Sequence, residues 1–459
     1  MLKHIVFFAI VALAIAVPIQ TAADVDAAIA AWKAGVAAVD ITPDSPMLMA
    51  GYAVRTGYGA NLINKLSAKA IVLEDAQRRR AVLVTLDLVG IARDFSQSIC
   101  EELRKKHGFE RPQVLIVCSH THSGPVVGHN LRPMHYDLAS KHDQQVIDRY
   151  AARLQQQIVA AVGRASGALE PAGLAWAGGK TTFAVNRRNN VESDVPRLRE
   201  QAALKGPVDH DVPVLRIRRA DGRLLAVVFG YACHATVLSG NAWSSDYPGF
   251  AQTELEKNHP GCTAMFVTGC AGDQNPIPRG NVAQAEQYGH DLAVAVDAVL
   301  VTPMTPLAAK LDARYREIEL PLGAIPSKPE VDRDAASRNK YVASRARYVL
   351  RQLRPDGSFP QTYPYPVAVW RLGELTLCAL GGEVVVDYSL RLKLERRPMW
   401  VAAYSNDIMA YIPSRRVLAE GGYEGGGAML YYGLSAPWGP EAEDRIIRAV
   451  HELAANSGD

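Results

Sequence analysis

The sequence predicts an α/β protein in which mixed β-sheets pack with helices in one large catalytic domain, with a site at strand ends. Apolar runs of strand length alternate with amphipathic stretches of helix length. Two pairs of apolar runs are joined by short polar turns, which indicates antiparallel hairpins beside the buried strands of an α/β sheet. Histidine, acidic and glycine residues follow several of these runs, where α/β folds collect their functional side chains.

The first two thirds of the chain supply most of the predicted elements. Continuous apolar runs indicate buried strands, and apolar residues at helical spacing indicate surface helices. In chain order we expect a hairpin of strands 68–74 and 81–87 across the turn 75–80, a helix 93–106, a buried strand 113–118, a helix 143–165, a hairpin of strands 212–218 and 223–231 across Asp221 and Gly222, a buried strand 264–268 and a helix 282–300.

The last third is interrupted by proline. Residues 321–329 break the pattern, a polar helix is expected over 332–353, and residues 355–366 contain four prolines and must be loop or extended chain. Strands 367–371 and 375–380 and a closing helix 441–455 follow. The proline-rich segment could link two domains. We favour an excursion within one domain, because candidate site residues lie on both sides of it.

Composition excludes several classes of protein. The 459 residues are 48% hydrophobic and 21% charged, which is ordinary for a globular chain and unlike a disordered, collagenous or coiled-coil one. The formal net charge of +3 is too balanced for a nucleic-acid-binding or anionic-membrane surface. The oligomeric state is left open.

The N-terminus has the pattern of a secretory signal peptide. Lys3 precedes the apolar run 5–17, and Thr21, Ala22 and Ala23 supply the small residues of a cleavage site. The run is shorter than the roughly 20 residues that cross a bilayer. We expect residues 1–23 to be removed and the mature domain, residues 24–459, to be exported to a periplasm or beyond. An uncleaved N-terminal anchor is the alternative. No later run is long and apolar enough to span a membrane.

Six cysteines are present without a Cys-x-x-Cys pair, which argues against a thiolate zinc ribbon. Most lie inside apolar runs and are expected to be core residues. Cys262 and Cys270 are close enough in sequence to pair in an oxidising compartment, and this disulfide is kept as an alternative.

The segment Ser119 to Pro125, which reads Ser-His-Thr-His-Ser-Gly-Pro, is the sharpest motif. It directly follows a predicted buried strand. In extended backbone the side chains of His120 and His122 point to the same side, so both imidazoles can reach one metal ion or one ligand. The motif differs from that of metallo-β-lactamases, because Ser123 and Gly124 follow in place of Asp-His.

Three further polar positions follow predicted strands. His234 ends the strand 223–231, Asp273 lies in the small-residue segment 268–276, and Glu383 follows Gly381 and Gly382. Asp273 could orient a histidine or bind a cation. Each position alone is as compatible with a turn or a packed core as with a site. Together they suggest a zinc site of two histidines and a glutamate with water in the open position, a hydrolytic arrangement.

These motifs resemble those of the neutral ceramidases, the non-lysosomal zinc amidases. The similar stretches include Ala34-Gly35, the sequence Asp-Ile-Thr-Pro at 40–43, Gly51-Tyr52-Ala53, the His-Thr-His-Ser-Gly-Pro motif and the glycine-rich loop around Tyr423. The resemblance implies one catalytic zinc ion and leaves room for a second, structural divalent cation near Asp273. It also implies an N-acyl lipid substrate of the sphingolipid type.

The resemblance implies a role for each matched residue. His120, His234, Glu383 and Tyr411 are similar to the zinc ligands. His122 resembles the non-ligand histidine beside the zinc, Arg187 the arginine that contacts substrate, and Tyr423 a tyrosine near the scissile bond. Asn275 stands where the family carries a serine that has been proposed as catalytic. Since an amide cannot be a nucleophile, a serine mechanism is excluded at this position, and Asn275 can only hydrogen-bond.

We therefore expect an exported zinc-dependent hydrolase that cleaves an amide bond. An ester or lactone, including a sugar-derived one, suits the same zinc-water chemistry, and a non-catalytic zinc-containing receptor is the alternative from another class. If the histidines were only packed core residues, no metal would bind. Because the 459 residues end soon after the predicted last helix, we expect no counterpart of the family's C-terminal β-sandwich domain in them. The expected substrate is therefore the broader class of N-acyl compounds and not ceramide specifically.

Overall fold

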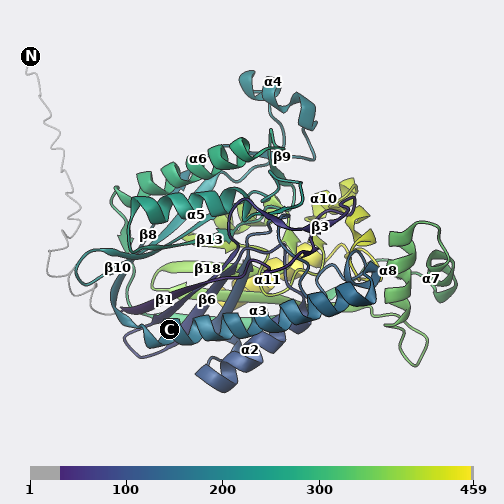
Figure 1. Cartoon of the computed structure of the whole chain (residues 1–459), viewed down its shortest axis with the longest axis horizontal. Coiled ribbons are helices and arrows are strands. Elements are labelled where there is room, and N and C mark those ends of the chain that lie inside the picture. Colours follow the sequence, from purple (N-terminus) through teal and green to yellow (C-terminus); the bar gives the residue numbers. More distant parts are fainter. Residues whose placement is uncertain (1–31, 456–459) are drawn as a thin grey trace, which may run out of the picture.

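Two β-sheets packed face to face form the centre of the molecule, and helices cover their outer faces (Figure 1). The computed structural model describes residues 32–455. The larger sheet has the strand order β13-β11-β10-β8-β1-β5-β6-β7, with β15 paired to β8, and the smaller sheet has the order β16-β17-β18-β20. This confirms the predicted α/β class with mixed sheets.

The strands of the larger sheet are antiparallel except for the outer pairs β11–β13 and β6–β7, which are parallel. Its members are β1 (Trp32–Asp40), β5 (Ser67–Glu74), β6 (Arg80–Leu86), β7 (Val114–Cys118), β8 (Glu170–Lys180), β10 (Asp211–Arg219), β11 (Leu224–Tyr231), β13 (Thr263–Thr268) and β15 (Thr305–Pro306). The smaller sheet consists of β16 (Leu311–Pro321), β17 (Thr362–Leu372), β18 (Leu375–Leu380) and β20 (Met399–Ala402).

Short strand pairs and helices complete the fold. The pairs are β2 (Met47–Leu48) with β3 (Tyr58–Gly59), β4 (Asn61–Leu62) with β12 (Ala242–Trp243), β9 (Ala184–Asn186) with β14 (Gln274–Pro276) and β19 (Glu383–Val384) with β21 (Tyr411–Ile412). The α-helices are α2 (Arg93–His107), α3 (Lys141–Gly167), α4 (Val195–Glu200), α5 (Asp246–Asn258), α6 (Val282–Leu300), α7 (Lys328–Ala335), α8 (Lys340–Leu350), α9 (Val386–Glu395), α10 (Arg415–Glu420) and α11 (Ala442–Ala454).

Alternation along the strands explains the layers. On β5, the side chains of Ala68, Ala70 and Val72 belong to the cluster that α2 and α3 cover, whereas Ile71 and Leu73 point into the layer between the two sheets. Helices α5 and α6 cover the β10–β13 part of the same outer face. Helices α9 and α11 pack on the smaller sheet. Both faces of each sheet are therefore buried over much of their area, as the continuous apolar runs predict.

The ends of β7 and β13 converge, and this convergence positions the site. The Thr268 hydroxyl donates to the Cys118 carbonyl (2.8 Å). The segment after β20 runs between the two strands: the Ala403 amide donates to the Thr268 carbonyl (2.9 Å), and the Cys118 amide donates to the Tyr404 carbonyl (3.1 Å). The loops that follow β7, β11, β13 and β18 consequently meet at one place.

Most predicted elements are confirmed, with boundary shifts of a few residues. The single helix expected over 332–353 is wrong. The structure has two helices there, α7 and α8, because the Asn339 side chain accepts from the amides of Tyr341 and Val342 and begins a new helix. The proline-rich segment is loop up to residue 361 and then enters strand β17. Within residues 32–455, no helix has both the length and the apolar character that a membrane crossing requires.

All six cysteines lie in the described part of the chain, and each is a free, buried thiol. The alternative disulfide between Cys262 and Cys270 is therefore not formed. Cys262 packs in the apolar cluster under α5 and α6. Cys270 belongs to a different cluster, the one that also contains Ala68, Ala70 and Val72 of β5. The expected signal peptide, residues 1–23, lies outside the described residues.

Candidate metal centre

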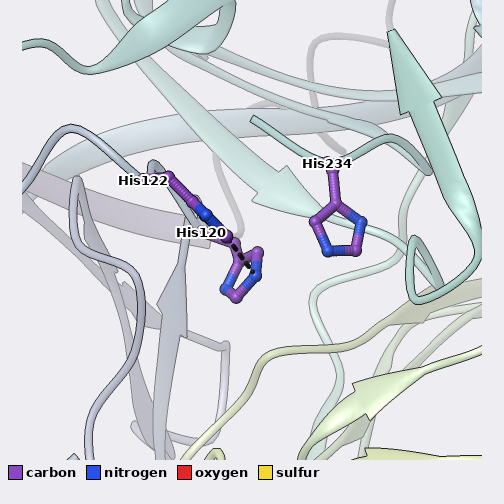
Figure 2. Close-up of side chains that lie close together, drawn as sticks. All are labelled: His120, His122 and His234. Carbon is purple, nitrogen blue, oxygen red and sulfur yellow. Dashed lines mark hydrogen bonds between the residues drawn. The ribbon is translucent and has the colours of Figure 1, made fainter. Parts of the chain in front are cut away.

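His120 and His234 point their Nε2 atoms into one buried cluster (Figure 2). His120 follows β7 and has φ +61°, a left-handed conformation that few non-glycine residues adopt. Its amide donates to the Leu88 carbonyl (3.0 Å), and its Nδ1 lies 2.6 Å from the Val89 carbonyl. His234 follows β11, and its Nδ1 lies 2.6 Å from the Ala271 carbonyl. Because a carbonyl only accepts, each Nδ1 carries the proton and each Nε2 presents a lone pair.

Glu383 faces both of these nitrogens. Its Oε2 lies 3.1 Å from Nε2 of His120 and 3.1 Å from Nε2 of His234, with all three side chains buried. Burial raises the pKa of the Glu383 carboxyl, but the neighbouring histidines outweigh it and hold the pKa well below its usual range. Burial, together with Arg187, lowers the pKa of His234 to about 4. A metal site needs this carboxylate ionised and the two Nε2 atoms free of protons.

His122 completes the cluster but is held differently. Its Nε2 lies 3.0 Å from Nε2 of His120, and its ring packs edge-on against Tyr52 at 4.6 Å between centroids. Its Nδ1 is buried and has no hydrogen-bond partner among the described residues. Metal-ligating histidines almost always donate their second ring N–H to an oxygen. His120 and His234 meet this criterion and His122 does not.

Tyr411 lies beside His234, and Arg187 lies beside Tyr411. The Tyr411 hydroxyl is 3.3 Å from Nε2 of His234 and accepts from Nη2 of Arg187 (3.1 Å). The Arg187 Nε donates to Glu424 (2.7 Å) and its Nη1 to Oδ1 of Asn275 (3.3 Å). Burial acts to lower the pKa of Arg187, but Tyr411 and Glu424 outweigh it and raise the pKa, so the guanidinium is a fixed positive charge beside the cluster.

Asn275 and Asp273 lie in the segment after β13, where β14 pairs with β9. Of the two roles that the sequence suggests for Asp273, orienting a histidine is not seen, since its hydrogen-bond partners include none of the three cluster histidines. Its Oδ1 accepts from the Val386 amide at the start of α9 and its Oδ2 from Asn186 (2.9 Å each), while its carbonyl accepts from the Arg187 amide (2.9 Å). Burial raises the pKa of Asp273 to about 6. Asp273 thus holds together the segments that carry Glu383, Arg187 and Asn275.

Tyr423 lies at the rim. Its ring is 46% exposed and packs edge-on against Tyr411, with 5.3 Å between ring centroids. Glu424 beside it is buried and accepts from both Arg187 and Arg188. The glycine-rich loop around Tyr423 is therefore fastened to the site by a buried carboxylate.

Sequence reasoning gave no role to three tyrosines at the cluster: Tyr52, Tyr404 and Tyr432. The Tyr432 hydroxyl donates to Oε1 of Glu383, and the ring of Tyr404 lies 4.4 Å from that of His120. The sequence indicates Tyr52 only as part of the family stretch Gly51-Tyr52-Ala53. Tyrosine is common in cores, and no local pattern separates these from the chain's other tyrosines. Their position is the one signal that the sequence offers, since Tyr404 lies in the segment after β20 and Tyr432 follows the glycine-rich loop.

The donor set fits a metal ion such as zinc. Oε2 of Glu383 lies 3.1 Å from Nε2 of His120 and from Nε2 of His234, and the Tyr411 hydroxyl lies 3.3 Å from Nε2 of His234. Neighbouring ligands of tetrahedral zinc, with bonds of about 2.0–2.1 Å, are separated by about 3.3 Å. Lone pairs that face each other at these distances repel unless a cation or protons lie between them. The cluster is therefore built for a cation.

Fold and site together define an α/β protein whose strand ends carry a buried His–Glu–Tyr cluster suited to a metal ion. The model of the N-terminal part of the neutral/alkaline non-lysosomal ceramidases matches residues 32–289, more than half of the chain. The chain belongs to this family. The match includes His120, His122, Arg187, His234, Asp273 and Asn275, whereas Glu383, Tyr411 and Tyr423 lie beyond it.

Individual relatives are distant. Neutral ceramidase B of Dictyostelium discoideum is 27% identical over 263 residues, and neutral ceramidase of Drosophila melanogaster is 26% identical over 262 residues. Each match covers 54% of this chain and 36% of the relative, so only about a third of each relative's length is matched. A crystal structure of neutral ceramidase from Pseudomonas aeruginosa superposes with a TM-score of 0.71 at 19% identity, covering 92% of this chain and 74% of that one. This likeness supports the fold.

Proposed function

We propose that the protein is an exported zinc-dependent hydrolase that cleaves an N-acyl amide bond. The observation that carries the proposal is the convergence of Nε2 of His120 and Nε2 of His234 on Oε2 of Glu383, at 3.1 Å each. Family membership supports the hydrolase class and the amide bond. Export rests on the signal-like residues 1–23, and the mature domain would then be residues 24–459.

His120, His234, Glu383 and Tyr411 would hold the zinc ion. When bound in such a site, zinc lowers the pKa of a coordinated water from roughly 15.7 to about 7 and polarises a carbonyl oxygen. The carbonyls of Val89 and Ala271 fix the tautomers that leave both Nε2 atoms free for the metal. Tyr432 holds the second oxygen of Glu383, which orients the carboxylate.

His122 is the residue we assign to proton transfer. Its Nε2 lies 3.0 Å from that of His120, yet within residues 32–455 its Nδ1 has no hydrogen-bond partner that would fix its protonation. An imidazole in this situation can accept a proton on one step and return it to the leaving amine on the next. Tyr52 packs against its ring and limits its movement. Gly51 is required beneath it, because a Cβ at that position would lie 2.5 Å from Cγ of His122.

Arg187, Asn275 and Tyr423 are assigned to the substrate. Because Arg187 donates to Oδ1 of Asn275, the amide group of Asn275 keeps its NH2 as a donor. Such a donor, aimed at the carbonyl oxygen as it gains negative charge, would stabilise the transition state. Tyr423, which packs against Tyr411 at the rim, supplies a hydroxyl as a second hydrogen-bond donor beside the Asn275 NH2 group. Arg187 carries a permanent charge that orients a polar part of the substrate.

The test is the zinc content of the purified protein, measured beside hydrolysis of an N-acyl-sphingosine and of simpler amides, esters and lactones. We expect about one zinc per chain and turnover of amides that a chelator abolishes. His120→Ala should lose both zinc and turnover, whereas His290→Ala, an exposed histidine paired with Glu254, should keep both.

Other outcomes point elsewhere. Turnover of esters or lactones alone would replace the amide assignment. Zinc without turnover of any compound would favour a zinc-containing receptor. Full zinc and full activity in His120→Ala would refute the ligand set.

A further inference from the structure

A pocket opens beside the cluster, and nine of its twelve lining residues have polar side chains, alongside Val191, Ile277 and Gly422. Its volume is about 680 Å³, within the range of about 300–1,000 Å³ that small-molecule sites have. Arg187, Asn275 and Tyr423 form its inner wall and connect it to the cluster. Arg188, Glu192 and Arg279 form much of the remainder, together with the exposed Asn189 and the buried Asn190. A substrate whose amide reaches the cluster would extend into this pocket.

The charges of the pocket are already paired with one another. Arg187 and Arg188 share Glu424, at 2.7 and 2.6 Å, and Arg279 binds Glu192 through two parallel hydrogen bonds of 2.9 and 2.8 Å. Each lining arginine already pairs with a carboxylate, so none of them is free to bind an anionic group of a substrate. A cationic group would meet the three arginines. An alkyl chain would remove water from these ion pairs without replacing its hydrogen bonds, which is unfavourable.

A neutral hydroxylated group matches this lining. Each hydroxyl both donates and accepts, so it can bond to an arginine N–H and to a glutamate or asparagine oxygen at the same time. The half-exposed ring of Tyr423 offers a flat apolar face to the C–H side of a sugar ring. The apolar crevice on the other side of Tyr423, between Pro413, Met429 and Trp438, has no space for even a water molecule.

We infer that the substrate is an N-acyl amide whose amine part is a neutral polyhydroxylated group of the amino-sugar type, rather than the alkyl chain of a lipid. This inference rests on the proposed amide hydrolase function for its catalytic readout. The pocket residues Glu192 and Arg279 act on specificity: they bind the hydroxylated group and take no part in bond cleavage.

The experiment compares three substrates of the zinc-loaded protein: N-butyryl-glucosamine, N-cyclohexylbutyramide, which has the same acyl group without hydroxyls, and a ceramide in mixed micelles. We expect kcat/KM for the sugar amide to exceed that of the other two by at least about 100-fold, since a site built to hydrogen-bond hydroxyls rejects analogues that lack them. Equal or faster cleavage of the cyclohexyl amide or of the ceramide would overturn the inference.

Variants separate binding from chemistry. Arg279→Met should raise KM for the sugar amide about tenfold, leave kcat within about twofold and leave KM for the cyclohexyl amide unchanged. Glu192→Gln is the second variant, in case Arg279→Met does not fold. Arg223→Met is the matched control, because Arg223 pairs with Asp221 in the turn at the opposite end of β11 from His234. A loss of kcat with both substrates would contradict a role in specificity.

Failure of the proposed function is distinguishable. If no amide is cleaved, calorimetric titration with N-acetylglucosamine and with N-cyclohexylacetamide decides the question. Binding of the sugar amide alone, weakened by Arg279→Met, would support the pocket assignment without hydrolysis. Equal binding of the two compounds, or binding of neither, would overturn it.

Discussion

Two backbone carbonyls decide which nitrogen of each cluster histidine faces the centre. The sequence singles out residues that the fold brings together: His120 and His122 share a motif after a buried strand, and His234 and Glu383 follow other strands. The sequence does not predict the tautomers, because the carbonyls that fix them belong to Val89 and Ala271, which lie 31 and 37 residues away. It also misses Tyr432, whose hydroxyl holds Glu383 across 49 residues.

Replacing Asn275 separates its two proposed roles, which are to accept a hydrogen bond from Arg187 and to donate one to the developing oxyanion. We expect Asn275→Ala and Asn275→Asp each to lower kcat by about 10²–10³, because both lose the NH2 donor to the developing oxyanion. Asn275→Asp keeps an oxygen that accepts from Arg187, so the local structure should persist. The measurement is kcat and KM for the best amide substrate, with circular dichroism as the check on folding. Wild-type kcat in Asn275→Asp would mean that only the contact with Arg187 matters.

Asp407 gives the protein a pH-dependent stability. Burial raises the pKa of its carboxyl from 3.8 to about 7, although Tyr363 donates to it at 2.7 Å. Between these two pKa values the unfolded chain is ionised and the folded chain holds the proton, so the free energy of unfolding falls as pH rises toward 7. Asp407→Asn removes this dependence. We expect the variant to gain about 2–3 kcal/mol over the wild type between pH 5 and pH 8.

Urea unfolding of both proteins at pH 5 and pH 8 measures this difference. Asp221→Asn is the control, because hydrogen bonds from Arg223 lower the pKa of Asp221 and keep it ionised throughout this range. Parallel pH profiles for wild type and Asp407→Asn would contradict the assignment.

At the scale of elements, short apolar runs identify buried strands reliably here, and exposed or irregular strands poorly. Strands β5, β6, β7, β13 and β18 are dense in apolar residues, and the sequence predicts all of them. Strand β8 contains Pro171 and three glycines, and β16 alternates charged residues with few apolar ones, so neither carries a strand signal. Their conformation is imposed by pairing with β10 and β17, which local sequence does not encode.

Gly35 lets helix α3 approach strand β1. A Cβ on Gly35 would lie 2.1 Å from the Ala165 carbonyl oxygen near the end of α3, and backbone cannot move aside as a flexible side chain can. We expect Gly35→Ala to reduce the free energy of unfolding by about 1–3 kcal/mol. Gly178→Ala on β8 is the matched control, because its Cβ would meet nothing within 4 Å. Equal urea midpoints for the two variants would show that the helix shifts freely.

At the scale of the whole molecule, the site joins parts of the chain that are far apart in sequence. His120 belongs to the edge of the larger sheet, Glu383 follows the smaller sheet, and Tyr411 reaches His234 across 177 residues. The sequence predicts that such residues meet only through motif and family resemblance. Hydrophobic pattern alone does not indicate that the segment after β20 enters between β7 and β13.

A metal bound by both sheets should stabilise the whole fold. Binding to the folded state alone contributes RT ln(1 + [L]/Kd), about 4 kcal/mol at a free zinc concentration 1,000-fold above Kd. We expect saturating zinc to raise the melting temperature of the chelator-treated protein by about 4–5 °C. His120→Ala and Glu383→Gln should lose this response, whereas His290→Ala should retain it. A melting temperature that ignores zinc in the wild type would mean that the cluster does not bind the ion in the folded state.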